Sequence, residues 1–172
     1  MFESGAVLGV DPGVAATGLA VVRREGPRHP VVWWGTVRTP AGQAEAIRLW
    51  SVYRAVREAI ARHRPAALAM ERLMWGRNAG SAMGVARASG VVLLAAAEAG
   101  LPVEEYAPLE VKMAVTGVGN AGKDAVRRSL AVALRADPVP TEPDAADAVA
   151  VAVCHLQQSR LRLLTRRAGA TR

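Results

Sequence analysis

Four carboxylates occur where the sequence predicts that ordered elements begin or end. Asp11 follows the apolar run 6–10, and Glu71 follows the apolar run 66–70. Asp144 and Asp147 are three residues apart, on one face of an expected helix. Carboxylate oxygens are the ligands that Mg²⁺ and Mn²⁺ prefer, and a pair of such ions activates water and stabilises the leaving oxygen in phosphodiester hydrolysis. If the fold brings the four acids together, they can hold a pair of metal ions.

Structural roles remain open for each acid taken alone. Asp11 lies in Asp-Pro-Gly, a common turn sequence. Asp144 follows Thr141 and Pro143, a pattern typical of a helix start. Asp147 lies among small apolar residues and Glu71 follows an apolar run, so burial of either carboxylate is costly without a cation or a donor. The metal hypothesis explains all four together.

The apolar pattern predicts an α/β protein whose sheet has an antiparallel and a parallel part. The first 40 residues read as an antiparallel meander, and later strands alternate with helices. The Ala- and Gly-rich helix at 81–99 allows close packing and is our candidate interface, and we expect His155 to have a structural role. The expected strands are 6–10, 17–22, 31–37, 66–70 and 101–106, and the expected helices are one through 49–60 that ends at Pro65, 81–99, 108–115, 123–136 and 143–158.

Composition and charge limit the classes of protein that fit. The 172 residues predict one domain at 1–158 and a basic tail at 159–172, which we expect to be frayed. The net charge of +7 suits a polyanionic partner. The single cysteine, Cys154, excludes an intrachain disulfide and a cysteine zinc site, and favours a cytoplasmic protein. We expect no membrane-spanning segment and no secretory signal.

A series of short motifs runs through residues 7–156. In their order and spacing they resemble the RuvC Holliday-junction resolvases, a family with the RNase H-like nuclease fold. The resemblance therefore implies a mixed five-stranded sheet whose first three strands are antiparallel, flanked by helices. The motifs are Leu8–Gly13 with Thr17-Gly18, Met70-Glu71, Asn78–Ala82, Tyr106-Ala107, Val111-Lys112, Gly117–Gly119, Lys123 and Asp144–Ala148.

This resemblance implies a homodimeric endonuclease that makes paired, symmetric cuts in four-way DNA junctions during recombination and repair. In the family, the acids that match Asp11, Glu71, Asp144 and Asp147 hold two Mg²⁺ or Mn²⁺ ions. The matching lysines, Lys112 and Lys123, contact DNA near the scissile phosphate, and we count Lys123 among the catalytic residues. A branch-migration motor of the RuvA and RuvB type is the expected partner complex.

Further DNA-binding candidates lie on the segment that follows Glu71. The family often has an aromatic residue at the position of Met74, where it stacks on bases near the junction centre. Here Trp75 is adjacent, and we expect Trp75 to take over that wedge role. Another departure from the family is Val14-Ala15, which replaces a polar or basic pair. The candidates are Met74, Trp75, Arg77, Asn78, Ser81 and Arg87.

Two rival functions remain open at this stage. The loop Gly117–Lys123 satisfies G-x-G-x-x-G and the first seven positions of a Walker A loop, which would suit a nucleotide-binding, ATPase-like protein. Against that interpretation, Asp124 occupies the position that needs Ser or Thr, and no well-formed strand precedes the loop. The other rival is a junction-binding protein without catalysis. Measurements of ATP affinity and of metal-dependent cleavage separate the three functions.

Overall fold

The computed structural model describes residues 5–26, 28–74, 79–134 and 139–169, with the backbone alone for 79–81, 133 and 160–169. Five strands form one mixed sheet in the order β3-β2-β1-β4-β5. β1, β2 and β3 pair antiparallel, whereas β4 is parallel to both β1 and β5. The predicted mixed five-stranded sheet is therefore confirmed. The strands are β1 (Ala6–Asp11), β2 (Ala16–Arg23), β3 (Val31–Arg38), β4 (Ala67–Glu71) and β5 (Val103–Tyr106).

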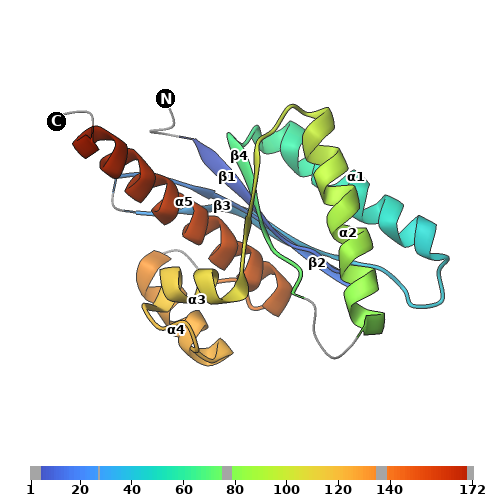
Figure 1. Cartoon of the computed structure of the whole chain (residues 1–172). Coiled ribbons are helices and arrows are strands. Elements are labelled where there is room, and N and C mark those ends of the chain that lie inside the picture. The colour runs from blue at the N-terminus through green and yellow to red at the C-terminus, as the bar shows by residue number, and fades with distance from the viewer. Residues whose placement is uncertain (1–4, 27, 75–78, 135–138, 170–172) are drawn as a thin grey trace.

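Helices cover both faces of the sheet and make a three-layer molecule (Figure 1). Two helices, α1 and α2, pack on each other over one face, and α5 crosses the other face with α3 and α4 beside it. The alternation of strands and helices agrees with the sequence prediction to within two or three residues at most boundaries. The helices are α1 (Glu45–His63), α2 (Ala79–Glu98), α3 (Pro108–Thr116), α4 (Lys123–Leu134) and α5 (Pro143–Gly169).

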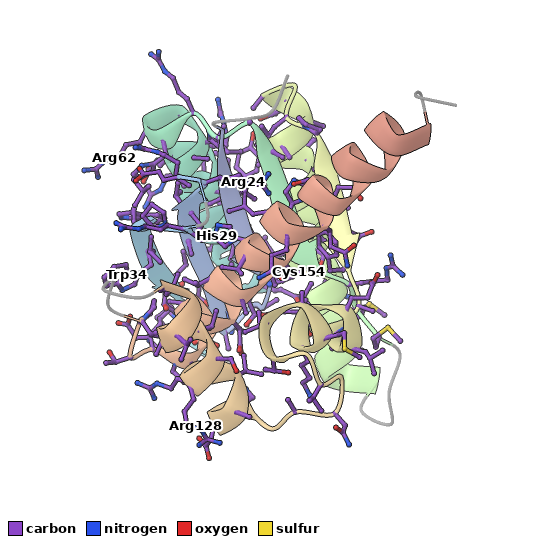
Figure 2. The ribbon with its side chains drawn as sticks, turned by 90° about the vertical axis from the view of Figure 1, so that its left-hand side faces the viewer. Arg24, His29, Trp34, Arg62, Arg128 and Cys154 are labelled. Atoms are coloured by element: carbon purple, nitrogen blue, oxygen red, sulfur yellow. The ribbon has the colours of Figure 1, made fainter. Side chains whose placement is uncertain are left out.

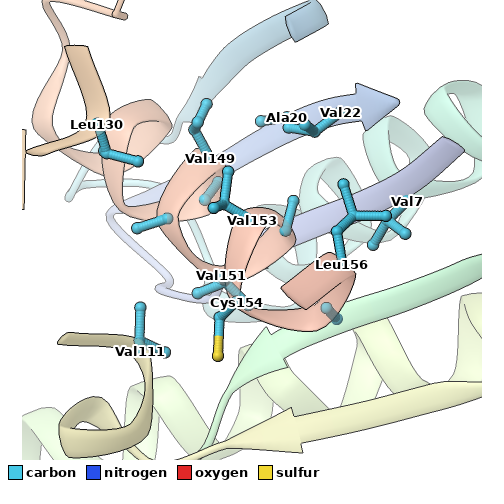
Figure 3. Close-up of a cluster of buried hydrophobic side chains, with 14 of the residues drawn as sticks. Val7, Ala20, Val22, Val111, Leu130, Val149, Val151, Val153, Cys154 and Leu156 are labelled. Carbon is cyan, nitrogen blue, oxygen red and sulfur yellow. The ribbon is translucent and has the colours of Figure 1, made fainter. Parts of the chain in front are cut away.

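Side chains of the central strands alternate between the two faces of the sheet and pack into two separate hydrophobic cores. Leu8 and Val10 of β1 point into the core beneath α1 and α2, whereas Val7 points into the core beneath α5. The α5 core is seen in Figure 3, where Val149 and Val153 lie close to the β2 strand. A sheet with apolar side chains on both faces has to be covered on both faces, so the sequence requires helices on each side.

Glycines on two neighbouring strands let α5 approach the sheet closely. A Cβ atom at Gly9 would overlap the carbonyl oxygen of Ala148, and one at Gly18 would overlap that of Asp144. The helix matches this closeness with small residues, since Ala145 and Ala148 are fully buried. This contact fixes the height of the first two turns of α5 above β1 and β2.

Two of the helix ends follow local signals in the sequence. Arg64 adopts the left-handed conformation after α1, with φ at 45°, and Pro65 then prevents further helix. Pro108 opens α3, and the Glu110 carboxylate accepts a hydrogen bond of 2.7 Å from the Ala107 N–H. These local signals determine where α1 ends and where α3 begins.

The last helix is longer than the sequence analysis predicts. We expected residues 159–172 to fray, but α5 continues to Gly169; residues 170–172 lie outside the described residues. The stretch from Ser159 to Ala168 is rich in Leu and Arg and has no Gly or Pro, so nothing in it ends the helix.

Basic side chains such as Arg62 of α1 and Arg128 of α4 extend outward from the fold (Figure 2).

Within the described part of the chain, no helix has the length and apolar character that crossing a lipid bilayer requires. The single cysteine lies on α5 and is buried, and burial, with a smaller contribution from Glu110, raises the pKa of the Cys154 thiol to about 12. A thiol with such a pKa stays protonated at neutral pH and is a poor nucleophile or metal ligand.

Candidate active site

Asp11 is the last residue of β1, and a buried threonine holds the turn that follows it. The Thr17 hydroxyl donates a 2.6 Å hydrogen bond to the carbonyl of Gly13 and accepts one of 3.3 Å from the Gly13 N–H. Thr17 is fully buried although it is polar. The turn therefore has a fixed shape, and the Asp11 carboxylate leaves the sheet in a defined direction.

Glu71 comes from the neighbouring strand end. β1 and β4 run parallel, with Val10 opposite Met70, so Asp11 and Glu71 follow at the same edge of the sheet. The carboxyl ends of adjacent parallel strands are where ligands bind in open α/β sheets. The sequence prediction that both acids terminate strands is confirmed.

Asp144 and Asp147 come from the first two turns of α5, directly above that sheet edge. The backbone of Asp144 lies against Gly18 of β2, the residue that pairs with Asp11. Asp147 follows one turn later on the same helix face, as the spacing predicts. Both side chains are partly exposed.

Burial, and to a smaller extent the charges of neighbouring acids, raise the pKa values in the cluster. Burial is the main cause that raises the pKa of Asp11 to about 7, and the charges of Asp147, Glu71 and Asp144 add to the rise. Burial also raises the pKa of Glu71 and of Asp147, with Asp147 contributing to the shift of Glu71. Such shifts are typical of a functional site because a cluster of carboxylates is unfavourable without a cation.

Three basic side chains partly compensate this negative charge. The Lys123 ammonium lies 3.5 Å from a carboxylate oxygen of Asp147, and the Arg38 guanidinium lies 3.8 Å from one of Asp144. Lys112 acts at longer range and lowers the pKa of Glu71 and of Asp147. The structure thus brings both predicted lysines toward the acids.

The donor chemistry of the cluster fits divalent cations, although its present geometry is open. Among the described residues, no three acidic, histidine or cysteine side chains converge closely enough to hold one metal ion. Four oxygen-donor carboxylates, one with a pKa near 7, nevertheless form the kind of site that Mg²⁺ or Mn²⁺ prefers. Side-chain rotation toward a cation would relieve their mutual repulsion.

A cavity adjoins the acid cluster between α4 and the start of α5. It has a volume of about 210 Å³, and Lys123, Arg127 and Asp147 line it together with apolar residues such as Leu130 and Pro143. The cavity leaves room beside Asp147 for part of a substrate, and its wall also carries Asp124 besides the two basic residues.

The other predicted DNA-binding residues have different positions. Met74 follows β4 and is 59% exposed, which suits a contact residue. Arg87 instead forms an ion pair with Glu45, which ties α2 to α1. Trp75, Arg77 and Asn78 lie outside the described residues, as does the side chain of Ser81.

Two weaker signals in the sequence have structural explanations. The loop Gly117–Lys123 connects α3 to α4, whereas a phosphate-binding Walker A loop follows a strand. Gly117 caps α3 with φ at 74°. His155 makes a 3.0 Å hydrogen bond with the hydroxyl of Tyr106, in line with the predicted structural role.

Sequence reasoning missed Arg38. It ends β3 and approaches Asp144 across the sheet edge, a contact between residues far apart in the chain. Its position before Thr39-Pro40, at the end of an apolar run, indicates a strand end but carries no sign of a functional partner.

Comparisons with known proteins give one consistent family. Residues 7–155 match the family model described as "Crossover junction endodeoxyribonuclease RuvC". The protein of that name from Syntrophomonas wolfei is 43% identical over 155 residues, which is 90% of each chain. The structure of Thermus thermophilus RuvC in complex with a Holliday junction substrate is 34% identical, with a TM-score of 0.86 over 91% of this chain and 96% of that one. The yeast mitochondrial Holliday junction resolvase Ydc2, 13% identical, has the same fold, with a TM-score of 0.64 over 97% of this chain and 85% of that one.

Proposed function

Because the chain belongs to the RuvC family of crossover junction endodeoxyribonucleases, we propose that it resolves four-way DNA junctions by paired, symmetric strand cuts. The observation that carries this proposal is the set of acids around Asp11, whose pKa is raised to about 7 by burial and by the charges of three further carboxylates. A passive junction-binding protein does not need such a cluster, and the loop Gly117–Lys123 lacks the preceding strand of a Walker A site.

Asp11, Glu71, Asp144 and Asp147 are the residues that would hold divalent cations. Bound there, two Mg²⁺ or Mn²⁺ ions would supply activation of water and stabilisation of the leaving 3′ oxygen. The chain itself contributes placement, because the acids stand on two strand ends and one helix face. Asp11 is the most buried of the acids with a shifted pKa, with the other three around it, and is our candidate for the residue shared by both ions.

The lysines supply positive charge for the substrate phosphate. Lys123 is 83% exposed and reaches Asp147 at only 3.5 Å, so its ammonium can contact Asp147 and a phosphate oxygen together. We therefore count Lys123 among the catalytic residues, and we propose that Lys112, which lowers the pKa of Glu71 and of Asp147, binds the DNA backbone. Phosphate contacts position the strand for in-line attack by water.

Residues 74–87 are the segment that would meet the centre of the junction. Met74 is exposed at the end of β4, close in the chain to Glu71. Trp75, Arg77, Asn78 and Ser81 remain proposed DNA contacts. Arg87 could contact DNA only beside its partner Glu45 or after leaving it.

A homodimer would supply the two-fold symmetry that paired cuts on a two-fold junction require. The outer face of α2 fits such an interface, since Met83, Leu93 and Leu94 are exposed there and Gly90 has open space around it. Exposed apolar side chains on one helix are typical of surfaces that associate.

In the cell, the junction substrate points to the cytoplasm and to a branch-migration motor complex of the RuvA and RuvB type as partner.

The test is cleavage of a labelled four-way junction and of the matching linear duplex with Mg²⁺, with Mn²⁺ and with EDTA. We expect metal-dependent cutting of the junction alone, and no measurable ATP affinity. Asp11→Asn should abolish cutting while junction binding persists. Cutting retained by Asp11→Asn would contradict the metal assignment, and binding without cutting by the wild type would favour the non-catalytic rival.

A further inference from the structure

Arg38 approaches the acid cluster in the same manner as Lys123. Its Nη2 atom lies 3.8 Å from Oδ2 of Asp144, while the Lys123 Nζ atom lies 3.5 Å from Oδ2 of Asp147. The two acids are neighbours on one face of α5, and the two cations come from different elements, β3 and the start of α4. Each acid at the start of α5 therefore has its own basic partner.

The backbone that carries Arg38 is fastened to the turn that follows Asp11. Arg38 pairs with Ala16 in the sheet, and the next residue, Thr39, donates its N–H to the carbonyl of Ala15 at 3.1 Å. The Thr39 hydroxyl donates a 2.5 Å hydrogen bond to the carbonyl of Val14. The backbone of Arg38 is therefore held at the end of β3 by the turn that follows Asp11.

The guanidinium is also available to a further ligand. The Arg38 side chain is 63% exposed, and among the ion pairs of the described residues it takes part only in the one with Asp144. Guanidinium has five N–H donors in a planar arrangement that matches phosphate oxygens. One edge can donate to Asp144 while another donates to the oxygens of a phosphate.

We propose that Arg38 binds a backbone phosphate of the cut strand next to the scissile position, as a second phosphate-binding residue beside Lys123. This inference rests on the proposed junction-cutting function. The main-chain carbonyls of Val14 and Ala15 hold the strand end that carries Arg38, through their hydrogen bonds with Thr39.

The first measurement is junction binding in EDTA at several salt concentrations, so that neither cleavage nor metal binding contributes. Each phosphate contact adds about 0.9 to the slope of log affinity against log salt on duplex DNA. Arg38→Ala should lower the slope by about that amount and weaken binding about tenfold, the factor for one charge-assisted hydrogen bond. Arg38→Lys should restore the slope because it keeps the charge.

Arg23→Ala is the matched control, since Arg23 is an exposed arginine at the far end of β2 that pairs with Glu25 at 3.6 Å. It should leave both slope and affinity nearly unchanged. Equal slopes for Arg38→Ala and Arg23→Ala would overturn the proposal. Slower cleavage by Arg38→Ala at an unchanged slope would also overturn it, because Arg38 would then act through Asp144 alone. Failure of the wild type to cut junctions would refute the proposed function instead.

Discussion

Gly18 of β2 lies against the main-chain carbonyl of Asp144, so closely that a Cβ atom at position 18 would overlap it. Gly18 also pairs with Asp11 in the sheet. One glycine therefore sets the spacing between an acid on β1 and an acid on α5. The geometry of the acid cluster depends on this backbone contact as much as on the acids themselves.

Gly18→Ala should push the start of α5 away from the sheet. We expect a loss of about 1 to 3 kcal/mol in the free energy of unfolding, the usual cost of overpacking, and a larger proportional loss of metal-dependent cleavage. Urea unfolding and junction cleavage measure the two effects. Gly42→Ala is the control, because open space surrounds Gly42; an equally active Gly18→Ala enzyme would contradict the argument.

The raised pKa of Asp11, about 7, predicts the pH dependence of the metal-free protein. The folded protein binds a proton at Asp11 more tightly than the unfolded chain, whose value is near 3.8. The free energy of unfolding should therefore fall as pH rises from about 4 to about 7. Above pH 7 Asp11 is ionised, and the whole of this loss is present.

Asp11→Asn removes this charge, so in EDTA at pH 8 we expect it to be more stable than the wild type by at least about 1 kcal/mol. The difference should shrink as pH falls through 7 toward 4. Thermal unfolding at several pH values measures it. A constant difference across this range would show that Asp11 does not titrate as described.

Lys123→Ala should slow junction cleavage by about a hundredfold, the typical effect of removing a group that stabilises charge at a reacting centre. Arg166→Ala, in the basic C-terminal part of α5, is the control and should have little effect on the rate. Single-turnover cleavage at saturating protein separates rate from binding. Equal effects of the two substitutions on the cleavage rate would show that Lys123 has no role in the active site.

Trp75→Ala should weaken junction cleavage and leave the melting temperature nearly unchanged if Trp75 stacks on bases, a contact worth roughly 1 to 3 kcal/mol per base. A large fall in melting temperature would instead identify Trp75 as a core residue. Met74→Ala is the companion variant, since Met74 is exposed at the same strand end. If Met74→Ala loses cleavage activity and Trp75→Ala keeps it, then Met74 is the residue that stacks on the bases.

Leu94→Asp should convert a dimer to monomers if the outer face of α2 is the interface, because the two-fold axis places the new charge in the contact twice. Leu94 is 54% exposed in the single chain. Val132→Asp on α4 is the control, at a still more exposed valine. Sedimentation at micromolar concentration distinguishes the two states, and a Leu94→Asp dimer would place the interface elsewhere.

Much of the fold and the nature of the acids could be predicted from the sequence because the signals are local. Apolar runs that end in Asp11 and Glu71 identify strand ends, and the spacing of Asp144 and Asp147 places them on one helix face. The order of motifs then indicates the family. These features depend on neighbours within a few residues, so the chain alone determines them.

Contacts between distant segments were decided only by the tertiary structure. Arg38 forms an ion pair with Asp144, Arg87 forms one with Glu45, and the start of α5 packs against Gly18. These residues are far apart in the chain, and no sequence pattern predicts that they meet. The extension of α5 to Gly169 was also missed, because a basic segment can be either a frayed tail or a solvated helix. Side-chain partners across a fold depend on how the layers pack, and packing is a property of the whole chain.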